Sequence, residues 1–529
     1  MSVSQPRLSL PAHRPIVMSD RGMVVAGHPR AAEAGTAILR AGGNAMDAAI
    51  AAAATLGVAI PFMNGLGGDA IGLWFDAKSG VTAINGSGKT AKAATAEAMR
   101  ARGLSALPRR GPLGVSVPGV VAAWAQSLEQ FGTKSLAEVL APAIQLAEGG
   151  VPLDRTSVAF FNGPEYAELA AEFPGLPSLY GQPGTAKLGA RLRQPKVAET
   201  LRNLSQQGWR AFYEGPLAAA WLAEAQAQGV LIEASDLAEH ETLFDKPLSL
   251  DWGGRRVHVA PPNSQGIALL AMLGLANEEE DRATGADDPL VDPVAYLMRK
   301  TAAFRIRDAY CGDPRRISLP ADILTPQSLS ALRKSAREPI SVSGGGDTST
   351  LVVVDGAGNA VSWVQSLFEA FGSGIVCAQH GIVLHNRAML ERLDDDPVRS
   401  LKGGYRPFHT LCPALVTGQD GLELAIATPG DHGQPQSLLQ VMRRHFEQGL
   451  DIQSAIEWPR IRHDQGSTVL LEARCPESWT TVLQDAGWTV QRVDGWSRLM
   501  GGVNAIRRMA DGLLMGGADP RRECYALGV

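Results

Sequence analysis

Thr348 is the residue of this sequence whose type and surroundings best suit covalent chemistry. Three glycines at 344–346 lead into the pair Asp347–Thr348, and a valine-rich run over 351–355 follows almost at once. A threonine hydroxyl becomes a useful nucleophile when a base removes its proton, and a free α-amine on the same residue can be that base. An α-amine has an ordinary pKa of about 7.7–8.0, so a modest downward shift makes it largely neutral. Cleavage between Asp347 and Thr348 would therefore create a nucleophile that carries its own base, which predicts acyl transfer.

The same hydroxyl group can account for the cleavage itself. Its attack on the carbonyl carbon of Asp347 would give an ester, and water would then open that ester. Glycines at 344–346 permit the unusual backbone angles that the attack requires, while the β-methyl of Thr348 restricts χ1. The alternative interpretation is a glycine-rich loop that enters an ordinary hairpin, with Thr348 only a β-branched residue at the start of a strand.

Two predicted strands would position this threonine. The runs 351–355 and 360–365 are rich in valine, as buried strands are, and the Gly-Ala-Gly turn at 356–358 joins them into a hairpin. Asn44 is expected to cap a helix that has Asp47 in its first turn. Further elements are expected as helices over 30–40, 115–126, 137–148 and 434–445, and as strands over 374–383 and 422–427.

The overall composition is that of a globular protein. The chain has 529 residues, of which 45% are hydrophobic and 19% charged, and its net charge is −5. These values exclude a disordered chain, and without a long basic block neither nucleic acid nor a membrane is an expected partner. A chain of this size often divides into two domains, but no proline-, serine- or charge-rich linker interrupts it. We therefore expect one intertwined domain, in which 1–347 becomes a large chain and 348–529 a small chain after cleavage.

The cysteines and histidines indicate neither a disulfide framework nor a metal site. The five cysteines are scattered and include no C-x-x-C pair, so we expect them to be reduced and buried. His380, His385, His409 and His432 fit neither a His-x-x-x-His helix pair nor a zinc finger. The chemistry predicted for Thr348 needs no metal and no organic cofactor.

Two apolar or basic stretches bear on the location of the protein. The first twenty residues include Arg7 and Arg14 and no apolar core of a signal peptide, so a cytoplasmic location is expected. The alanine-rich stretch 48–63 is shorter than the roughly 20 residues that span a bilayer, and Gly57 and Pro61 interrupt it. We expect it to form a buried helix.

A segment that resembles a phosphate-binding loop supports a remote alternative. Residues 83–90 read Ala-Ile-Asn-Gly-Ser-Gly-Lys-Thr, and Asp355 at the end of an apolar strand would be the magnesium ligand. The usual pattern has glycine where Ala83 stands. The preceding sequence also lacks the βαβ alternation of a nucleotide-binding sheet, so an NTPase ranks last.

Several short motifs occur along the chain in a fixed order: Gly27-His28-Pro29, Gly42-Gly43-Asn44-Ala45-Met46-Asp47, Gly65-Leu66-Gly67-Gly68-Asp69, Val117-Pro118-Gly119, the stretch 353–362, Thr428-Pro429-Gly430 and Gly517-Ala518-Asp519-Pro520-Arg521. Together they resemble the γ-glutamyltranspeptidase family over about residues 23–522. The resemblance implies an N-terminal-nucleophile hydrolase of the α+β class, with a four-layer αββα sandwich. It also implies one precursor that is cut into two chains, which stay together as a heterodimer.

The resemblance also implies roles for single residues. Thr348 takes the position of the nucleophile, and Ser366 that of a hydroxyl which hydrogen-bonds to it. The backbone N–H groups of Gly430 and Asp431 take the positions of oxyanion donors, each typically worth about 2.7–4 kcal/mol. The family usually has a second glycine where Asp431 stands. Asn386 matches an asparagine that lines the site, although a strand serine and a turn asparagine are the plain alternatives for Ser366 and Asn386.

The positions that recognise substrate depart from the family pattern. An arginine that binds the α-carboxylate is replaced by Gly86, an aspartate that binds the α-amine by Leu390, and an asparagine by Phe368. A pair of serines becomes His409-Thr410. These changes remove both charges that hold an α-amino acid, and an unpaired ion in a closed pocket is costly. Glutathione is therefore expected to be a poor substrate.

Other polar residues could bind a short carboxylate instead. Arg387 and Arg406 are the candidate guanidinium groups, with His409 and Thr410 close to Arg406 in sequence. The oxamate amidohydrolases of purine breakdown are similar family members that also lack the glutamyl-binding residues. Hydrolysis of oxamate to oxalate and ammonia is thus the leading hypothesis. An acylase for glutaryl or β-lactam side-chain amides comes second and a γ-glutamyltransferase or glutathione hydrolase third, while an uncleaved, inactive binding protein is the alternative of another class.

Overall fold

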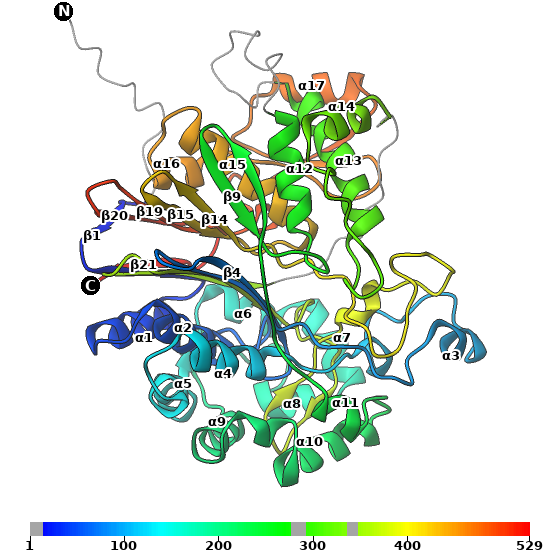
Figure 1. Cartoon of the computed structure of the whole chain (residues 1–529). Helices are drawn as coiled ribbons and strands as arrows, with labels where there is room; N and C mark the ends of the chain where they lie inside the picture. Colours follow the sequence, from blue (N-terminus) through cyan, green and yellow to red (C-terminus); the bar gives the residue numbers. More distant parts are fainter. Residues whose placement is uncertain (1–13, 277–291, 336–347) are drawn as a thin grey trace, which may run out of the picture.

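Two seven-stranded β-sheets lie face to face, and helices cover the outer face of each sheet (Figure 1). The computed structural model describes residues 14–276, 292–335 and 348–529. The expected four-layer αββα sandwich is confirmed. Asp347 and the glycines at 344–346 lie outside the described residues, so the predicted cleavage site is seen only on its Thr348 side.

One sheet, here called the nucleophile sheet, contains the predicted hairpin. Strands β10 (Ser349–Asp355) and β11 (Ala360–Ser366) pair antiparallel, with Thr350 opposite Val364. Both predicted strands are confirmed. Every residue of the two strands is buried, because helices cover one face of this sheet and the second sheet covers the other. In order across the sheet, β10 and β11 lie between β21 (Tyr525–Gly528), β2 (Gly22–Ala26) on one side and β3 (Asp69–Asp76), β4 (Gly80–Asn85), β7 (Leu243–Asp245) on the other.

The second sheet carries the loop that holds the predicted oxyanion donors. Strand β15 (Gly421–Ala427) is its middle strand and confirms the strand expected over 422–427. The short 3-10 helix η5 (Asp431–Gly433) and then helix α15 (Gln434–Phe446) follow it. The sheet order is β1 (Val17–Ser19), β20 (Leu514–Ala518), β19 (Asn504–Arg508), β15, β14 (Ala414–Gly418), β9 (Arg255–Val259), β8 (Leu248–Trp252).

The alanine-rich stretch forms the buried helix α2 (Ala45–Ala59), all of whose residues are buried. The Asn44 side chain accepts hydrogen bonds from the backbone of Met46 and Asp47, and the Asp47 carboxylate accepts one from the backbone of Asn44. This capping box starts the helix as predicted, and the helix ends before Pro61. Within the described ranges, no helix is both long and apolar enough to cross a membrane.

The other helices form the two outer layers and the connections between them (Figure 1). The predictions over 30–40, 137–148 and 434–445 are confirmed by α1, α5 and α15. On the side of the nucleophile sheet, the helices are α1 (Pro29–Arg40), α4 (Val120–Phe131), α5 (Leu136–Gly149), α6 (Arg155–Asn162), α7 (Pro164–Glu172), α8 (Gly175–Tyr180), α9 (Pro195–Gln207), α10 (Gly215–Ala227) and α11 (Ala234–Ala238). On the opposite side they are α12 (Gly266–Ala276), α13 (Pro293–Tyr310), α14 (Pro326–Ser335), α15, α16 (Ile452–Glu457) and α17 (Ser478–Asp485).

Two predicted elements differ in the structure. The helix expected over 115–126 begins only at Val120 as α4, because the residue before Pro118 is disfavoured in the helical region and Ser116 instead pairs with Thr90 in a β-bridge. The Pro118 carbonyl accepts a hydrogen bond from the Tyr213 hydroxyl. The strand expected over 374–383 is instead two short strands, β12 (Val376–Cys377) and β13 (Ile382–Val383), which form a hairpin. The turn residue Gly381 has a φ of 67°, which ends the extended backbone there.

The segment over 83–90 does not have the geometry of a phosphate-binding loop. Strand β4 ends at Asn85, and the next helix, α3 (Ala96–Ala101), begins well beyond Lys89. A phosphate-binding loop requires a helix N-terminus directly after the loop. The Lys89 ammonium donates to the backbone carbonyl of Glu239 at 3.4 Å.

The C-terminal motif forms a buried ion cluster between the second sheet and α16. One Asp519 oxygen lies 2.8 Å from Nη2 of Arg460, the other lies 3.1 Å from Nη1 of Arg521, and Arg521 Nη2 lies 2.7 Å from Glu472. All four side chains are buried. Although burial favours the neutral acid, Arg460 and Arg521 hold the pKa of Asp519 below its ordinary value. The motif therefore stabilises the fold through paired charges.

We expect Arg521→Met to destabilise the protein by about 3–5 kcal/mol, because it leaves two buried carboxylates without their shared partner. Urea unfolding followed by circular dichroism measures the loss. Because the pKa of Asp519 is lower in the folded state, its ionised carboxylate stabilises the fold at pH values above the ordinary aspartate pKa. This stabilisation is lost as the pH falls through the pKa of Asp519 in the folded protein. The exposed pair Arg256–Asp251 is the matched control, and Arg256→Met should cost less than about 1 kcal/mol. Equal losses in the two variants would contradict this assignment.

Candidate active site

Thr348 and Ser366 meet at one end of the neighbouring strands β10 and β11 of the nucleophile sheet. Thr348 directly precedes β10, Ser366 ends β11, and Oγ1 of Thr348 donates to Oγ of Ser366 at 3.2 Å. Both side chains are almost fully buried. The Ser366 hydroxyl also accepts from the backbone N–H of Phe368 at 2.7 Å. The antiparallel register of β10 and β11 thus brings together the two hydroxyl groups that the sequence paired by resemblance.

A buried amide network supports both hydroxyl residues, and sequence reasoning missed it. Nδ2 of Asn64 donates to Oγ of Ser349 at 2.9 Å, while Oδ1 of Asn64 accepts from Nε2 of Gln365 at 2.7 Å. Ser349 follows Thr348, and Gln365 precedes Ser366. Asn64 therefore links the residues next to the two hydroxyls. Its position just before the Gly65–Asp69 motif was the only signal available in the sequence.

The predicted oxyanion loop has a backbone that suits its residues. Gly430 has a φ of 120° and Asp431 a φ of 53°, which is the left-handed region. Aspartate tolerates this region better than most residues, which explains how it can stand where the family usually has glycine. Nε2 of Gln265 donates to the carbonyls of both Thr410 and Asp431, at 2.5 and 2.8 Å. This buried glutamine, which sequence reasoning also missed, holds the predicted oxyanion loop beside the predicted substrate-binding loop.

Arg387 is a fully buried cation, and some of its N–H donors are unpaired among the described residues. Nη1 of Arg387 donates to Oγ1 of Thr410 at 2.9 Å, and its guanidinium carbon lies 4.3 Å from the ring centroid of Phe368. Nε and Nη2 have no hydrogen-bond acceptor within residues 14–276, 292–335 and 348–529. Burial lowers the pKa of Arg387 to about 10, although Asp69 and Asp431 oppose that change. The group is therefore still positive at neutral pH, and two of its N–H donors have no acceptor among the described residues.

Arg406 has a different environment. Its Nε donates to the carbonyl of Ser87 at 2.9 Å, its Nη2 donates to the carbonyl of Glu241 at 2.7 Å, and its backbone N–H donates to Asp313 at 2.7 Å. These bonds join three loops. Of the two arginines that the sequence could not separate, Arg387 is thus the one with free donors.

The buried carboxylate of Asp69 lies between two histidines. Oδ2 of Asp69 lies 3.2 Å from Nε2 of His409 and 3.7 Å from Nδ1 of His385. Burial would raise the pKa of Asp69, but His385, His409 and Arg387 hold it at about 2. Burial, together with Arg387, lowers the pKa of His409 to about 3. His409 is therefore a neutral hydrogen-bonding residue at physiological pH, and the negative charge of Asp69 acts on Arg387 without a direct ion-pair contact.

Asn386 braces the loop that follows β11. Nδ2 of Asn386 donates to the carbonyl of Arg109 at 2.8 Å and to Glu369 at 3.2 Å, and its Oδ1 accepts from the backbone of Glu369 at 3.3 Å. In this loop Phe368 and Phe371 have φ values of 75° and 62°. Asn386 therefore supports an unusual backbone that places the Phe368 ring under Arg387.

Gly86 and Leu390, two of the residues that depart from the family pattern, are closely packed against their neighbours. A Cβ atom on Gly86 would lie 2.4 Å from Cβ of Ala123, so an arginine could not enter without movement of α4. Leu390 belongs to η4 (Arg387–Leu390) and packs on the apolar core beneath the second sheet. Neither position offers a charge to an α-amino acid.

The predicted histidines lie in three separate places. His385 and His409 flank Asp69, His380 bonds to Glu224 near the surface, and His432 bonds to Arg307 at 2.8 Å. Among the residues that the structure describes, no group of three or more His, Cys, Asp or Glu side chains could hold a metal ion. All five cysteines are buried and free.

A small cavity adjoins Thr348. It measures about 20 Å³, which is room for about one water molecule. Its lining includes Thr348, Met63, Pro429, Arg498 and Arg522. Arg387 lies outside this lining, so the cavity and the free donors of Arg387 are distinct parts of the candidate site.

Comparison with known proteins agrees with this geometry. Residues 31–529 match the protein family described as gamma-glutamyltranspeptidase. The chain is 36% identical to the oxamate amidohydrolase proenzyme of Klebsiella pneumoniae and 34% identical to the glutathione hydrolase-like YwrD proenzyme of Bacillus subtilis, each over 97% of this chain and 99% of the relative. The crystal structure of cephalosporin acylase from Bacillus halodurans superposes with a TM-score of 0.91 at 31% identity, covering 100% of this chain and 99% of the other.

Proposed function

The chain belongs to the γ-glutamyltranspeptidase family, and from this premise we propose that it is a self-processing amidohydrolase whose substrate is a small acid amide, with oxamate as the leading candidate. Membership makes the protein an amide-bond hydrolase of the N-terminal-nucleophile type. Cleavage before Thr348 would give chains 1–347 and 348–529, which the shared sheets hold together as a heterodimer. Curated relatives with the word proenzyme in their names support this step.

The proposed reaction uses one residue as nucleophile and base. Oγ1 of Thr348 attacks the amide carbon, and its freed α-amine takes the hydroxyl proton. The amine passes this proton to the leaving nitrogen as the C–N bond breaks, which releases ammonia and leaves an ester on Thr348. Water then attacks the ester, the same amine takes a proton from the water and returns it to Oγ1, and the acid is released. The N–H groups of Gly430 and Asp431 stabilise the oxyanion in both steps.

The observation that carries the substrate assignment is the pair of free donors on Arg387. Nε and Nη2 lie on one edge of the guanidinium group, and that edge matches the two oxygens of a carboxylate. Phe368 stacks on the guanidinium, and Thr410 fixes its other edge. A short acid such as oxamate would place its carboxylate on this edge and its amide carbon toward Thr348. Turnover of oxamate would make purine breakdown, implied by the resemblance, the cellular role.

A panel of amides tests this proposal. We expect release of ammonia from oxamate with a kcat/KM at least about 10²-fold above that for release of p-nitroaniline from γ-glutamyl-p-nitroanilide, because no charge replaces the family's ammonium partner at Leu390. Glutaryl-7-aminocephalosporanic acid tests the acylase alternative, which the similarity to a cephalosporin acylase favours. Background rates with oxamate and rapid turnover of the glutaryl amide would replace the first assignment with the second. Preference for the γ-glutamyl substrate would exclude both.

A further inference from the structure

A second pocket opens on the helical layer beneath the nucleophile sheet, at the start of α9. Its outer chamber has a volume of about 240 Å³, which is smaller than most drug-binding pockets and suits a molecule of amino-acid size. The lining contains both polar and apolar groups. It consists of Ser178, Leu179, Tyr180, Arg193, Gln194, Pro195, Lys196, Val197, Ala378 and Gln379.

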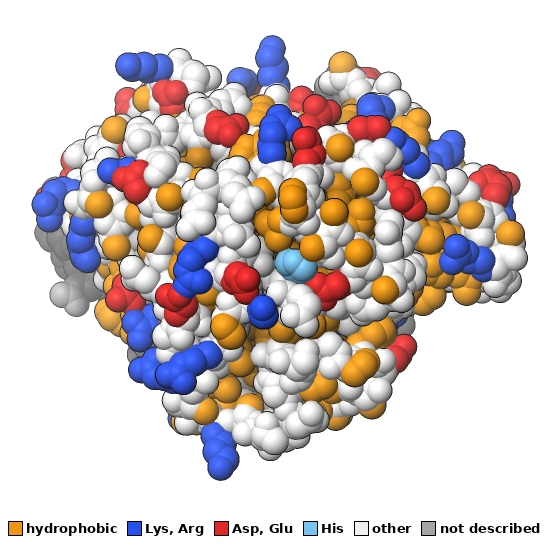
Figure 2. Space-filling view, turned by 90° about the horizontal axis from the view of Figure 1, so that it is seen from below, with side chains coloured by type: hydrophobic (Ala, Val, Ile, Leu, Met, Phe, Trp, Pro, Cys, Tyr) orange, Lys and Arg blue, Asp and Glu red, His pale blue; other side chains and the backbone are white. Residues whose placement is uncertain are grey.

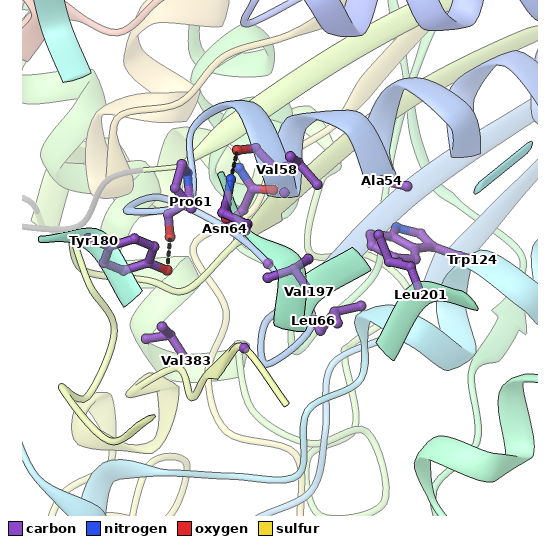
Figure 3. Close-up of a pocket in the computed structure, with 14 residues that line it drawn as sticks. Ala54, Val58, Pro61, Asn64, Leu66, Trp124, Tyr180, Val197, Leu201 and Val383 are labelled. Atoms are coloured by element: carbon purple, nitrogen blue, oxygen red, sulfur yellow. Dashed lines mark hydrogen bonds between the residues drawn. The ribbon is translucent and has the colours of Figure 1, made fainter. Parts of the chain in front are cut away.

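An inner chamber continues the pocket toward α2. The two chambers share Tyr180, Gln194 and Val197 in their linings. The inner chamber measures about 20 Å³, enough for about one water molecule. Figure 3 shows apolar side chains, such as Trp124 and Leu201, around it. A ligand would therefore occupy the outer chamber only.

Gln194 contributes a side-chain carbonyl oxygen that lacks a hydrogen-bond donor among the described residues. The residue is 5% exposed, and its Nε2 donates to the carbonyl of Val58 at 2.7 Å. Its Oε1 is buried and has no hydrogen-bond donor in the described part of the chain. A buried carbonyl oxygen without a donor is costly, so this position favours a ligand that carries an N–H or O–H group.

The mouth of the outer chamber supplies a positive charge. Arg193 is exposed and forms no ion pair with any described residue, whereas the Lys196 ammonium lies 3.1 Å from Glu199. Figure 2, which views the molecule from the side of this helical layer, shows both basic and acidic side chains on that face. One local guanidinium at a pocket of this size favours a single carboxylate.

The segment 58–64 connects this pocket to the active site. Gln194 bonds to the carbonyl of Val58, and Tyr180 points its hydroxyl at the carbonyl of Pro61, 3.5 Å away (Figure 3). The next three residues then contact the catalytic region. The carbonyls of Phe62 and Met63 accept from the backbone of Phe371 and Leu367 at 2.7 and 2.8 Å, and Asn64 bonds to Ser349 and Gln365.

We propose that the outer chamber is an effector site for a small apolar carboxylate that also carries a hydrogen-bond donor. Its carboxylate binds Arg193, its donor binds Oε1 of Gln194, and its apolar part packs on Leu179 and Val197. The ligand acts on Thr348 through the segment 58–64, which also sets the loop that contains Phe368. The site lies outside the set of residues assigned to the reaction.

Calorimetric titration of the processed protein tests the binding step, and it requires no substrate. The probe is N-acetyl-L-leucine, with 4-methylpentanoate as the analogue without a donor and N-acetyl-L-leucinamide as the analogue without a charge. We expect both analogues to bind at least about tenfold more weakly, since a hydrogen bond to a charged or buried group is worth about that factor. Arg193→Gln should weaken the probe about tenfold, and Val197→Phe should abolish its binding by filling the chamber. Arg202→Gln, which lies in α9 but outside the lining, is the matched control and should change nothing.

Two further measurements separate this site from the active site. Binding must persist in Arg387→Met, whereas loss of binding there but not in Arg193→Gln would overturn the proposal. Absence of heat from all three probes would also overturn it. For coupling, the probe should change kcat for whichever amide the substrate panel identifies, and Arg193→Gln should remove that change. An unchanged kcat at saturating probe would disprove the effector role even if the proposed substrate is correct.

Discussion

Thr348→Ala is expected to yield a single uncut chain with no measurable amide hydrolysis. The alanine lacks the hydroxyl that attacks the Asp347 carbonyl, so no new α-amine forms. Both the nucleophile and its base are then missing, and residual activity should lie at least about 10³-fold below the wild type. Denaturing electrophoresis and intact mass measure the cleavage, and ammonia release measures the activity.

Two variants control this result. Thr348→Ser keeps the hydroxyl but loses the β-methyl that restricts χ1, so it should retain slow cleavage and part of the activity. Ser366→Ala removes the hydroxyl 3.2 Å from Oγ1 of Thr348 and should slow both steps without abolishing them. If the Thr348→Ala variant is still cleaved into two chains, the hypothesis that Thr348 carries out the cleavage is wrong. An active wild-type enzyme whose small chain begins elsewhere would also contradict it.

Arg387→Met is expected to lower kcat/KM for oxamate by about 10²–10³-fold, because a paired carboxylate loses a bidentate, charge-assisted contact. Arg387→Lys should recover only a small part of this loss, since an ammonium group cannot present two parallel donors. Steady-state ammonia release gives both values. Electrophoresis must show that each variant is still cleaved, so that the loss is assigned to the substrate.

Oxamide provides the matched control on the substrate side. It replaces the carboxylate of oxamate by an uncharged amide of similar shape, so Arg387→Met should affect it far less than oxamate. The difference between the two substrates isolates the contact from any general disturbance of the buried site. Equal losses for oxamate and oxamide would show that Arg387 acts on the fold or on Asp69 and not on the substrate.

Parts of the fold that depend on local patterns were predictable. The valine-rich runs on each side of a tight turn predicted β10 and β11, and Asn44 with Asp47 predicted the start of α2. The errors also had local causes. Pro118 delayed the start of α4, and Gly381 divided an apparent strand into a hairpin. Such residues set backbone angles that apolar composition alone does not reveal.

The candidate site was only partly predictable, because its members come from distant segments. Arg387 and Arg406 look equivalent in sequence, yet Arg406 is bound by two carbonyls while Arg387 keeps two free donors. His409 was expected near a substrate, and burial beside Arg387 makes it a neutral residue. Asn64 and Gln265 carry no motif of their own, and only their hydrogen bonds identify them.

The order of residues alone predicts which group reacts, because a threonine that follows glycines and precedes a hairpin is a local pattern. Only the tertiary structure decided which of the two candidate arginines, Arg387 or Arg406, has unpaired donors. Donors and acceptors far apart in the chain, such as Asn263 and Ser87 (176 residues) or Asp69 and His409 (340 residues), become neighbours in the buried interior. There the hydrogen bonds of an arginine decide whether it stabilises loops, as Arg406 does, or keeps unpaired donors, as Arg387 does. Sequence spacing does not reveal these hydrogen bonds, because they form only in the folded, low-dielectric interior.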